Sequence, residues 1–276
     1  MRHIAGIDHV VIAVRDLDRA QDAFTRLGFT LTPRGHHNLG SQNHSVMLGA
    51  DYVELLAVPQ PHPALQYFSD FVAVGDGLSA IAFATDDASA AHAELEQVGI
   101  SAAPPLDLSR PIELVEGTRT ASFRVVLLSA QATSGSLAFL CQQLTREHVW
   151  RPEHQAHAIG ATAIAEIAFI AEDAAACAEG YARILGARPE RIGDRLRLRT
   201  RDVSLTFGSR STLEHRLAGV ALPPREPAAA ALFLRCADRA AAAECLRRGG
   251  HALVEIGDGS VAIGAEHAHG VALVFV

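Results

Sequence analysis

Two side chains with chemical potential interrupt apolar runs in the first quarter of the sequence. His9 lies within residues 7–14, and Glu54 lies within residues 52–56. Both runs have the length and the apolar, largely β-branched character of buried strands. A carboxylate buried in such a strand needs a partner, because an isolated charge is costly to remove from water. The two residues are therefore interpreted either as a buried pair or as two ligands of a divalent cation.

Other residues could add to such a site, and each has a structural alternative. His44 is either a metal ligand or base, or a residue of a turn. Arg124 interrupts an apolar strand, where it could hold a carboxylate or phosphonate, or simply face solvent. Trp150, the single tryptophan, either covers a pocket or packs between domains. The turn histidines His36 and His37 are more typical of a solvated segment.

The elements that must position these residues repeat four times. Each unit reads as a strand, an aspartate, a helix, a glycine and three further strands, and the pattern restarts near residues 78, 164 and 231. One unit cannot bury both faces of its sheet. Two units paired edge to edge would form a curved sheet with helices outside and a concave inner face. The sequence therefore predicts a domain at 1–147 (units 5–60 and 77–144), a linker at 148–160 and a second domain at 161–276.

Within the first two units the strands can be placed approximately. After each opening strand and helix, strands are predicted at 29–32, 45–48, 52–58, 100–102, 121–128 and 136–142, with a polar turn at 36–40. Asp16 or Asp18 can cap the first helix. A short amphipathic helix is expected between residues 62 and 76.

Composition excludes several classes of function. The chain has 276 residues, a formal net charge of −7 and no basic cluster, which argues against a nucleic-acid partner. It contains no lysine, so Schiff-base chemistry is excluded. The four cysteines form no CxxC pair, which fits a reducing cytoplasm. We also expect no leader sequence, because the first residues run straight into a strand, and no membrane contact, since no apolar run reaches the roughly 18 residues of a span.

Several stretches resemble the glyoxalase-like domains of the vicinal oxygen chelate superfamily, which includes glyoxalase I, extradiol dioxygenases and bleomycin resistance proteins. These stretches are residues 7–17, 27–29, 43–44 with 52–56, and 149–153. The resemblance is strongest over residues 5–160 and is topological beyond them. It implies an α+β fold in which four tandem βαβββ units form two domains of this type with curved mixed sheets.

The resemblance also implies a metal site at His9 and Glu54, which occupy the positions of the histidine and glutamate ligands of metal-dependent members. Zinc, nickel, manganese or iron would suit such ligands. The matching residues of the second unit, Ala80 and Phe139, cannot bind metal, so His44, a turn histidine, His148 or water would have to complete the site. The third and fourth units offer Glu166 and Ala231 at the place of His9. The C-terminal domain is therefore expected to be degenerate, as a scaffold or dimer surface.

The implied function is that of a metal-dependent glyoxalase-like lyase or isomerase. It would act on a small vicinal-oxygen substrate in the concave face of the N-terminal domain, with Glu54 and His44 as candidate catalytic residues. An extradiol-dioxygenase-like enzyme is less favoured, because two histidines and one carboxylate are not visible in one domain. The alternative is a metal-free small-molecule binding protein of the resistance type. The candidate substrate-binding residues are Arg124, Phe139, Phe83, His148 and Trp150, together with Phe123. A homodimer is left open.

Overall fold

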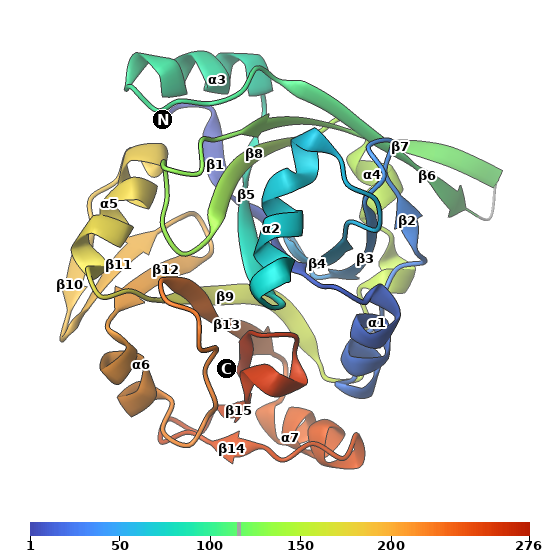
Figure 1. Ribbon diagram of the computed structural model, residues 1–276. Coiled ribbons are helices and arrows are strands. Elements are labelled where there is room, and N and C mark those ends of the chain that lie inside the picture. Colours follow the sequence, from blue (N-terminus) through green and yellow to red (C-terminus); the bar gives the residue numbers. More distant parts are fainter. Residues whose placement is uncertain (115–116) are drawn as a thin grey trace.

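The computed structural model describes residues 1–114 and 117–276 as a curved, open mixed β-sheet, with some helices on its convex side and others over its concave side (Figure 1). The strands are β1 (Ile4–Ala13), β2 (Gly35–His36), β3 (Gln42–Met47), β4 (Tyr52–Ala57), β5 (Gly77–Thr85), β6 (Leu106–Leu114), β7 (Gly117–Leu127), β8 (Leu137–Gln143), β9 (Ala161–Ile170), β10 (Glu190–Ile192), β11 (Arg195–Arg199), β12 (Ser204–Gly208), β13 (Ala228–Cys236), β14 (Val254–Glu255), β15 (Val261–Ile263) and β16 (Ala272–Phe275). The α-helices are α1 (Leu17–Arg26), α2 (Gln66–Val74), α3 (Ala88–Gln97), α4 (Arg146–Val149), α5 (Ala174–Leu185), α6 (Arg210–Arg216) and α7 (Arg239–Arg248). In the described part of the chain, no helix has the length and apolar character needed to cross a bilayer.

The same local device starts one helix in every unit. Asp16, Asp87, Asp173 and Asp238 precede α1, α3, α5 and α7, and each side chain accepts hydrogen bonds from backbone N–H groups of the first turn. Of the two candidates for α1, Asp16 is the cap.

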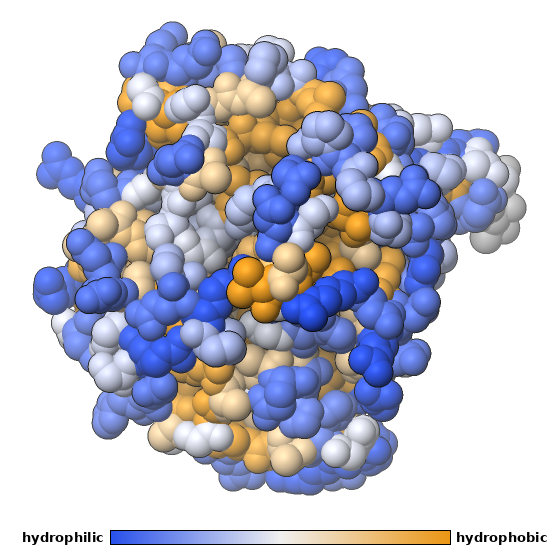
Figure 2. Space-filling model, in the orientation of Figure 1, coloured by the Kyte–Doolittle hydropathy of each residue, from blue (hydrophilic) through white to orange (hydrophobic). Residues whose placement is uncertain are grey.

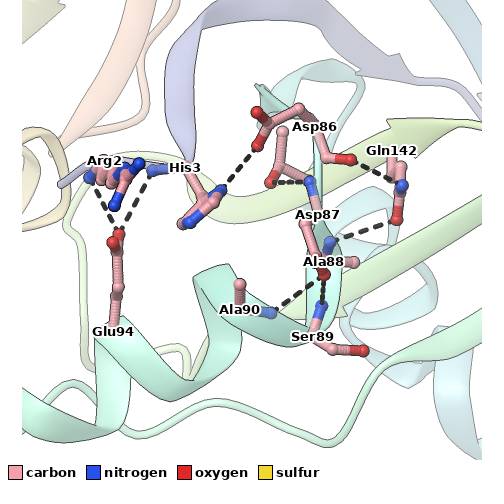
Figure 3. A network of polar contacts seen from close by, with 10 residues as sticks. Arg2, His3, Asp86, Asp87, Ala88, Ser89, Ala90, Glu94 and Gln142 are labelled. Carbon is pink, nitrogen blue, oxygen red and sulfur yellow. Dashed lines mark hydrogen bonds and ion pairs between the residues drawn. The ribbon is translucent and has the colours of Figure 1, made fainter.

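The cap of α3 belongs to a wider polar network (Figure 3). Asp87 accepts from the N–H groups of Ser89 and Ala90, both at 3.0 Å, while the side-chain oxygen of Gln142 accepts from the N–H of Ala88 at 3.1 Å. The carboxylate of Glu94 accepts from the first residues of the chain, which ties the N-terminus to α3.

Strand pairing confirms the predicted fold class. In each unit the first strand runs parallel to the last, and the first strands of neighbouring units are antiparallel, β1 to β5 and β9 to β13. The two pairs of units are joined where Ala229 of β13 bridges Leu78 of β5. The two sheets therefore continue into one another as a single curved layer.

The two faces of this layer have different cores. On the convex side, one continuous apolar cluster takes residues from all four repeat helices, including Phe24, Leu95, Tyr181 and Leu246. On the concave side each half has its own cluster. In the N-terminal half α2 and the β6–β7 hairpin cover this face, and in the C-terminal half α6 packs Leu213 into it. Figure 2 shows hydrophobic residues between hydrophilic ones over the region where Figure 1 places α2.

Three predicted details are corrected. The second strand of unit one is the short β2, so the expected turn carries the strand, and residues 29–32 form no strand, although the N–H of Thr32 donates to the carbonyl of Ser45 at 3.0 Å. In unit two the strand is β6 rather than residues 100–102, of which only Ala102 forms an isolated bridge. Helix α6 was not predicted, because its seven residues are largely polar and lack a clear apolar period.

Candidate functional site

A largely apolar pocket of about 80 Å³ lies on the concave face of the N-terminal half. Strands β1, β4, β7 and β8 form its floor and wall, and α2 and β6 close it. Its apolar lining includes Val11, Leu56, Phe68, Leu108, Phe123 and Phe139. Its polar lining includes His9, His37, Asn43, Glu54 and Arg110. The volume is sufficient for several water molecules or part of a small organic ligand.

A β-bulge brings Asp8 and His9 together at the edge of this pocket. Ile7 pairs with Phe83 and His9 pairs with Ala82, so Asp8 is an extra residue in β1. In regular strands neighbouring side chains point to opposite faces, whereas a bulge can turn two of them to the same side. The carboxylate of Asp8 consequently accepts from Nδ1 of His9 at 2.6 Å, with both residues buried.

This contact favours one tautomer of the His9 ring. An ionised Asp8 carboxylate can only accept, so a neutral ring would carry its proton on Nδ1 and leave the lone pair of Nε2 available. Gln143 donates a second hydrogen bond to the same Asp8 oxygen at 2.9 Å. The ring is stacked on Tyr52 with a centroid distance of 4.3 Å. His9 therefore presents Nε2 in one orientation.

Glu54 faces that free nitrogen from the neighbouring strand. It is 8% exposed, and its Oε2 lies 3.7 Å from Nε2 of His9, too far for a direct hydrogen bond. Its other oxygen accepts from Nδ2 of Asn43 at 2.6 Å. The hydrogen bond from Asn43 thus fixes one oxygen of the Glu54 carboxylate, and the other oxygen, Oε2, faces His9. The predicted meeting of His9 and Glu54 is present in the structure.

Asp8, His9 and Cys141 form a second possible cation-binding group, with one potential ligand atom of each within 4.8 Å of the others. Asp8 already accepts two hydrogen bonds with the oxygen that faces the ring. Burial raises the pKa of Cys141 well above its usual value, which keeps it a thiol. Both features make this group a poorer cation site than His9 with Glu54, because metal ligands must be deprotonated.

The corresponding positions of the other units explain why the pair occurs once among them. In unit two, Ala80 and Phe139 take these places, and Phe139 contacts the His9 ring edge-on at 5.4 Å. In unit three, Glu166 accepts from Thr206 at 2.5 Å and forms an ion pair with Arg216 of α6. The concave face of the C-terminal half is thus occupied by the Glu166–Arg216 ion pair and covered by α6.

His44, predicted to share the site, lies on the other face of the sheet. It pairs with Leu55, whose side chain belongs to the convex core, while its neighbour Asn43 faces the pocket. Nδ1 of His44 donates to the carbonyl of Thr32 at 2.8 Å. Because strand side chains alternate between faces, His44 cannot reach a cation bound by His9 and Glu54. The prediction that it is a ligand or base of this site is corrected.

The same alternation corrects two predicted substrate-binding residues. In β7, Phe123 and Val125 line the pocket, so Arg124 between them points away and forms an ion pair with exposed Asp107 at 2.6 Å. In β5, Phe83 lies in the convex core. Phe139 and Phe123 do line the pocket, as predicted.

His148 and Trp150 lie beside the pocket rather than in it. Nδ1 of His148 donates to the carbonyl of Thr120 at 2.8 Å. Trp150 packs edge-on against Tyr52 at 5.4 Å, on a ring that in turn stacks on His9. Of the turn histidines, His36 is exposed, whereas His37 lines the pocket, where burial lowers its pKa.

Arg110 is a pocket residue that the sequence analysis missed. It lies in β6, is 6% exposed and lines the pocket together with Leu106 and Leu108. These three residues alternate along the sequence, which is the signal that could have placed them on one face. The signal was hidden because prolines 104, 105 and 111 argue against a strand.

Removal of the Asp8 carboxylate tests whether it sets the tautomer of His9. In Asp8→Ala, we expect a mixture of Nδ1–H and Nε2–H forms, since the ring loses its acceptor. In Asp8→Asn the amide oxygen can still accept, and the Nδ1–H form should persist. ¹⁵N chemical shifts of the ring nitrogens distinguish the two forms. An unchanged Nδ1–H form in Asp8→Ala would contradict this role.

The comparisons with known proteins agree with this architecture. Residues 7–185 match the family model described as a glyoxalase-like domain. A crystal structure of a hypothetical protein from Staphylococcus aureus superposes with a TM-score of 0.71 at 12% identity, covering 98% of each chain. A fusion of a xylose isomerase-like TIM barrel and 4-hydroxyphenylpyruvate dioxygenase gives a TM-score of 0.59 at 15% identity, over 99% of this chain and 48% of that one.

A mutant of 4-hydroxymandelate synthase from Streptomyces coelicolor gives a TM-score of 0.58 at 16% identity, over 92% of this chain and 77% of that one. At such identities these structures establish a shared fold, while chemistry depends on the site. No curated protein sequence matches the chain significantly. The family match covers more than half of the sequence, and the strand pairing agrees with it. The chain belongs to the glyoxalase-like family of the vicinal oxygen chelate superfamily.

Proposed function

We propose that this protein is a metal-dependent glyoxalase-like lyase or isomerase that acts on a small vicinal-oxygen substrate in the N-terminal pocket. The proposal depends on one observation, the approach of His9 and Glu54 to 3.7 Å at the polar end of an otherwise apolar pocket. The pocket thus combines polar groups at one end, where a reaction could take place, with apolar walls that exclude water. This combination is typical of sites for small substrates.

The donor set fits a divalent ion such as zinc, nickel, manganese or iron. Two ligands about 2.1 Å from a tetrahedral ion lie about 3.4 Å apart, and Nε2 of His9 and Oε2 of Glu54 are 3.7 Å apart. The Asp8 contact on Nδ1 is the support that metal-binding histidines commonly have. An ion held by these two residues supplies Lewis-acid polarisation of neighbouring substrate oxygens.

The chain's own residues then orient the substrate and move a proton. Asn43 holds one oxygen of Glu54, and the other, Oε2, would bind the ion or, where it is not engaged by the ion, act as a base that takes a proton from a carbon beside a carbonyl group. Returning that proton to the neighbouring carbon gives an isomerase, and loss of a leaving group gives a lyase. Phe139, Phe123 and Leu108 would pack on the substrate and exclude water from this step.

A second candidate function is metal-free binding of a small molecule. Ala80 and Phe139 favour it, since they replace ligands at the two matching positions of the neighbouring unit. In this case His9 and Glu54 would be a buried polar pair beneath the ligand, with Asp8 and Asn43 satisfying their remaining hydrogen bonds.

Metal content separates the two candidates. We expect untagged wild-type protein to contain near-stoichiometric divalent metal by plasma mass spectrometry, and Glu54→Gln to lose it. Glu166→Gln is the matched control, because it removes a carboxylate from the third unit, outside the pocket. Absence of metal after incubation with zinc, nickel, manganese and iron(II) would contradict the enzyme proposal and favour binding. Loaded protein would be assayed with α-keto aldehydes and with catechols, where oxygen consumption identifies a dioxygenase.

A further inference from the structure

The Arg110 side chain occupies a place that the surrounding chain keeps open. A Cβ atom on Gly35 would lie 2.3 Å from Oδ1 of Asn43, 2.9 Å from Cδ of Arg110 and 3.2 Å from its Nη1. The absence of a side chain at Gly35 thus leaves room for both the Arg110 guanidinium and the Asn43 amide. The pocket therefore accommodates a buried cation.

Among the described residues this cation has no carboxylate in direct contact, although Glu54 of the same pocket attracts it at longer range. No carboxylate lies within ion-pair distance of Arg110, and its Nε has no hydrogen-bond partner. Other arginines behave differently, since Arg124 of β7 pairs with Asp107 and Arg216 of α6 pairs with Glu166. An unpaired buried charge is destabilising, because the desolvation of the ion is not compensated.

The surroundings favour an anion at this position. A second hollow of about 200 Å³ shares Arg110 with the pocket. Its described lining residues include the basic side chains of Arg34, His36, His148, Arg151 and His154 and one carboxylate, Glu113. Arg34 and Arg151 are paired with Asp18 and Glu153, so Arg110 is the arginine of this hollow whose charge is left to attract a negatively charged ligand.

We infer that Arg110 binds the anionic group of the pocket's ligand, and that this ligand is an organic carboxylate with a small apolar body. A guanidinium matches the two oxygens of a carboxylate, and the leucine and phenylalanine walls match the body. This inference rests on the proposed function insofar as it assigns the same pocket. It adds the class of substrate and a residue that determines specificity.

Matched acid and amide probes test the inference on the full chain freed of metal by chelation. We would titrate propionate, hexanoate, benzoate and phenylacetate, each beside its neutral amide, and measure dissociation constants by calorimetry. At least one acid is expected to bind about tenfold more tightly than its amide, as loss of one charge-assisted contact would give. Arg110→Gln should remove this preference, and Arg124→Gln, whose side chain faces away from the pocket, should retain it.

Equal binding of every acid and its amide to wild-type protein would overturn the inference, as would a preference that survives in Arg110→Gln. Failure of every acid to bind would overturn it as well. A preference that appears only after metal is restored would assign the anion to the metal instead, which supports the proposed function and removes the role of Arg110. The result that contradicts the role of Arg110 therefore differs from the result that contradicts the proposed metal-dependent function.

The stability of the free protein provides a second measurement. Because the charge is unpaired, Arg110→Met is expected to keep or raise the melting temperature of the ligand-free protein while abolishing the preference for acids. A fall in the melting temperature of Arg110→Met, comparable to that caused by truncating a core residue, would indicate a structural residue and contradict the inference.

Discussion

Replacement of Gly270 by alanine is expected to lower the free energy of unfolding by about 3 kcal/mol. Gly270 has a φ of +82°, and a Cβ there would lie 2.2 Å from the carbonyl oxygen of Asp76 and 3.1 Å from Cα of Gly77. These are backbone atoms at the start of β5, so they cannot move aside as a side-chain end could. Asp76 also bonds His269 at 2.8 Å and the N–H of Arg15 at 3.1 Å. The substitution would therefore push apart segments of three units.

Gly250→Ala is the control for this prediction. Gly250 has nearly the same φ, +79°, and its Cβ would meet nothing within 4 Å. It measures the cost of the left-handed conformation alone, about 1 kcal/mol. Chemical denaturation of both variants would isolate the steric part. Equal losses of stability would show that the contact with Asp76 is not rigid.

The repeat was the strongest signal in the sequence, and it determined the fold correctly. Each aspartate and each following helix has a local physical reason, since the cap satisfies free N–H groups within four residues. Such local rules can be read without knowledge of the rest of the chain. His9 and Glu54 could also be paired, because the repeat fixes which strands are neighbours.

The errors come from features that depend on a single step of register. Arg124 and Phe83 are predicted to lie in the pocket, yet Phe123 and Val125 beside Arg124 line it instead, and beside Phe83 it is Ala82 that lies in the concave core. A shift of one position moves a side chain to the other face, and an apolar run buried on both faces carries no alternation to fix it. His44 was misplaced for the same reason.

Arg110 illustrates a different limit. Its strand begins after two prolines and contains a third, which is tolerated because the β6–β7 hairpin pairs along one side of β6. The bulge at Asp8 was equally invisible, since it depends on how β1 meets β5. Arg110 and Asp8, which complete the polar end of the pocket, thus lie in a proline-containing strand and at a β-bulge. Local sequence rules predict such irregular features least well.

The Asp51→Asn variant is expected to be more stable than the wild type at pH 8, by up to about 4 kcal/mol, and nearly equal to it at pH 4. Asp51 is 3% exposed, and burial raises its pKa to about 7. Both of its oxygens accept from the N–H of Ile164 in β9, at 3.1 and 3.3 Å, so it links units one and three.

The direction of the pH dependence follows from this raised pKa. Below about pH 4 the carboxyl is protonated in both the folded and the unfolded chain, and its contribution is fully present. As the pH rises toward 7 the unfolded chain loses the proton first, so the folded state loses stability relative to it. An asparagine keeps an oxygen for the Ile164 N–H and does not ionise, and therefore avoids this loss.

Urea denaturation of both proteins between pH 4 and pH 8 would measure the effect. The difference in unfolding free energy should grow across this range and level off above about pH 7, as linkage requires. Asp22→Asn, a substitution of an exposed aspartate on α1, should show no such trend. A difference that does not change with pH would mean that Asp51 is ionised in the folded protein throughout. The contact with Ile164 would then join the two halves as an ordinary hydrogen-bonded carboxylate.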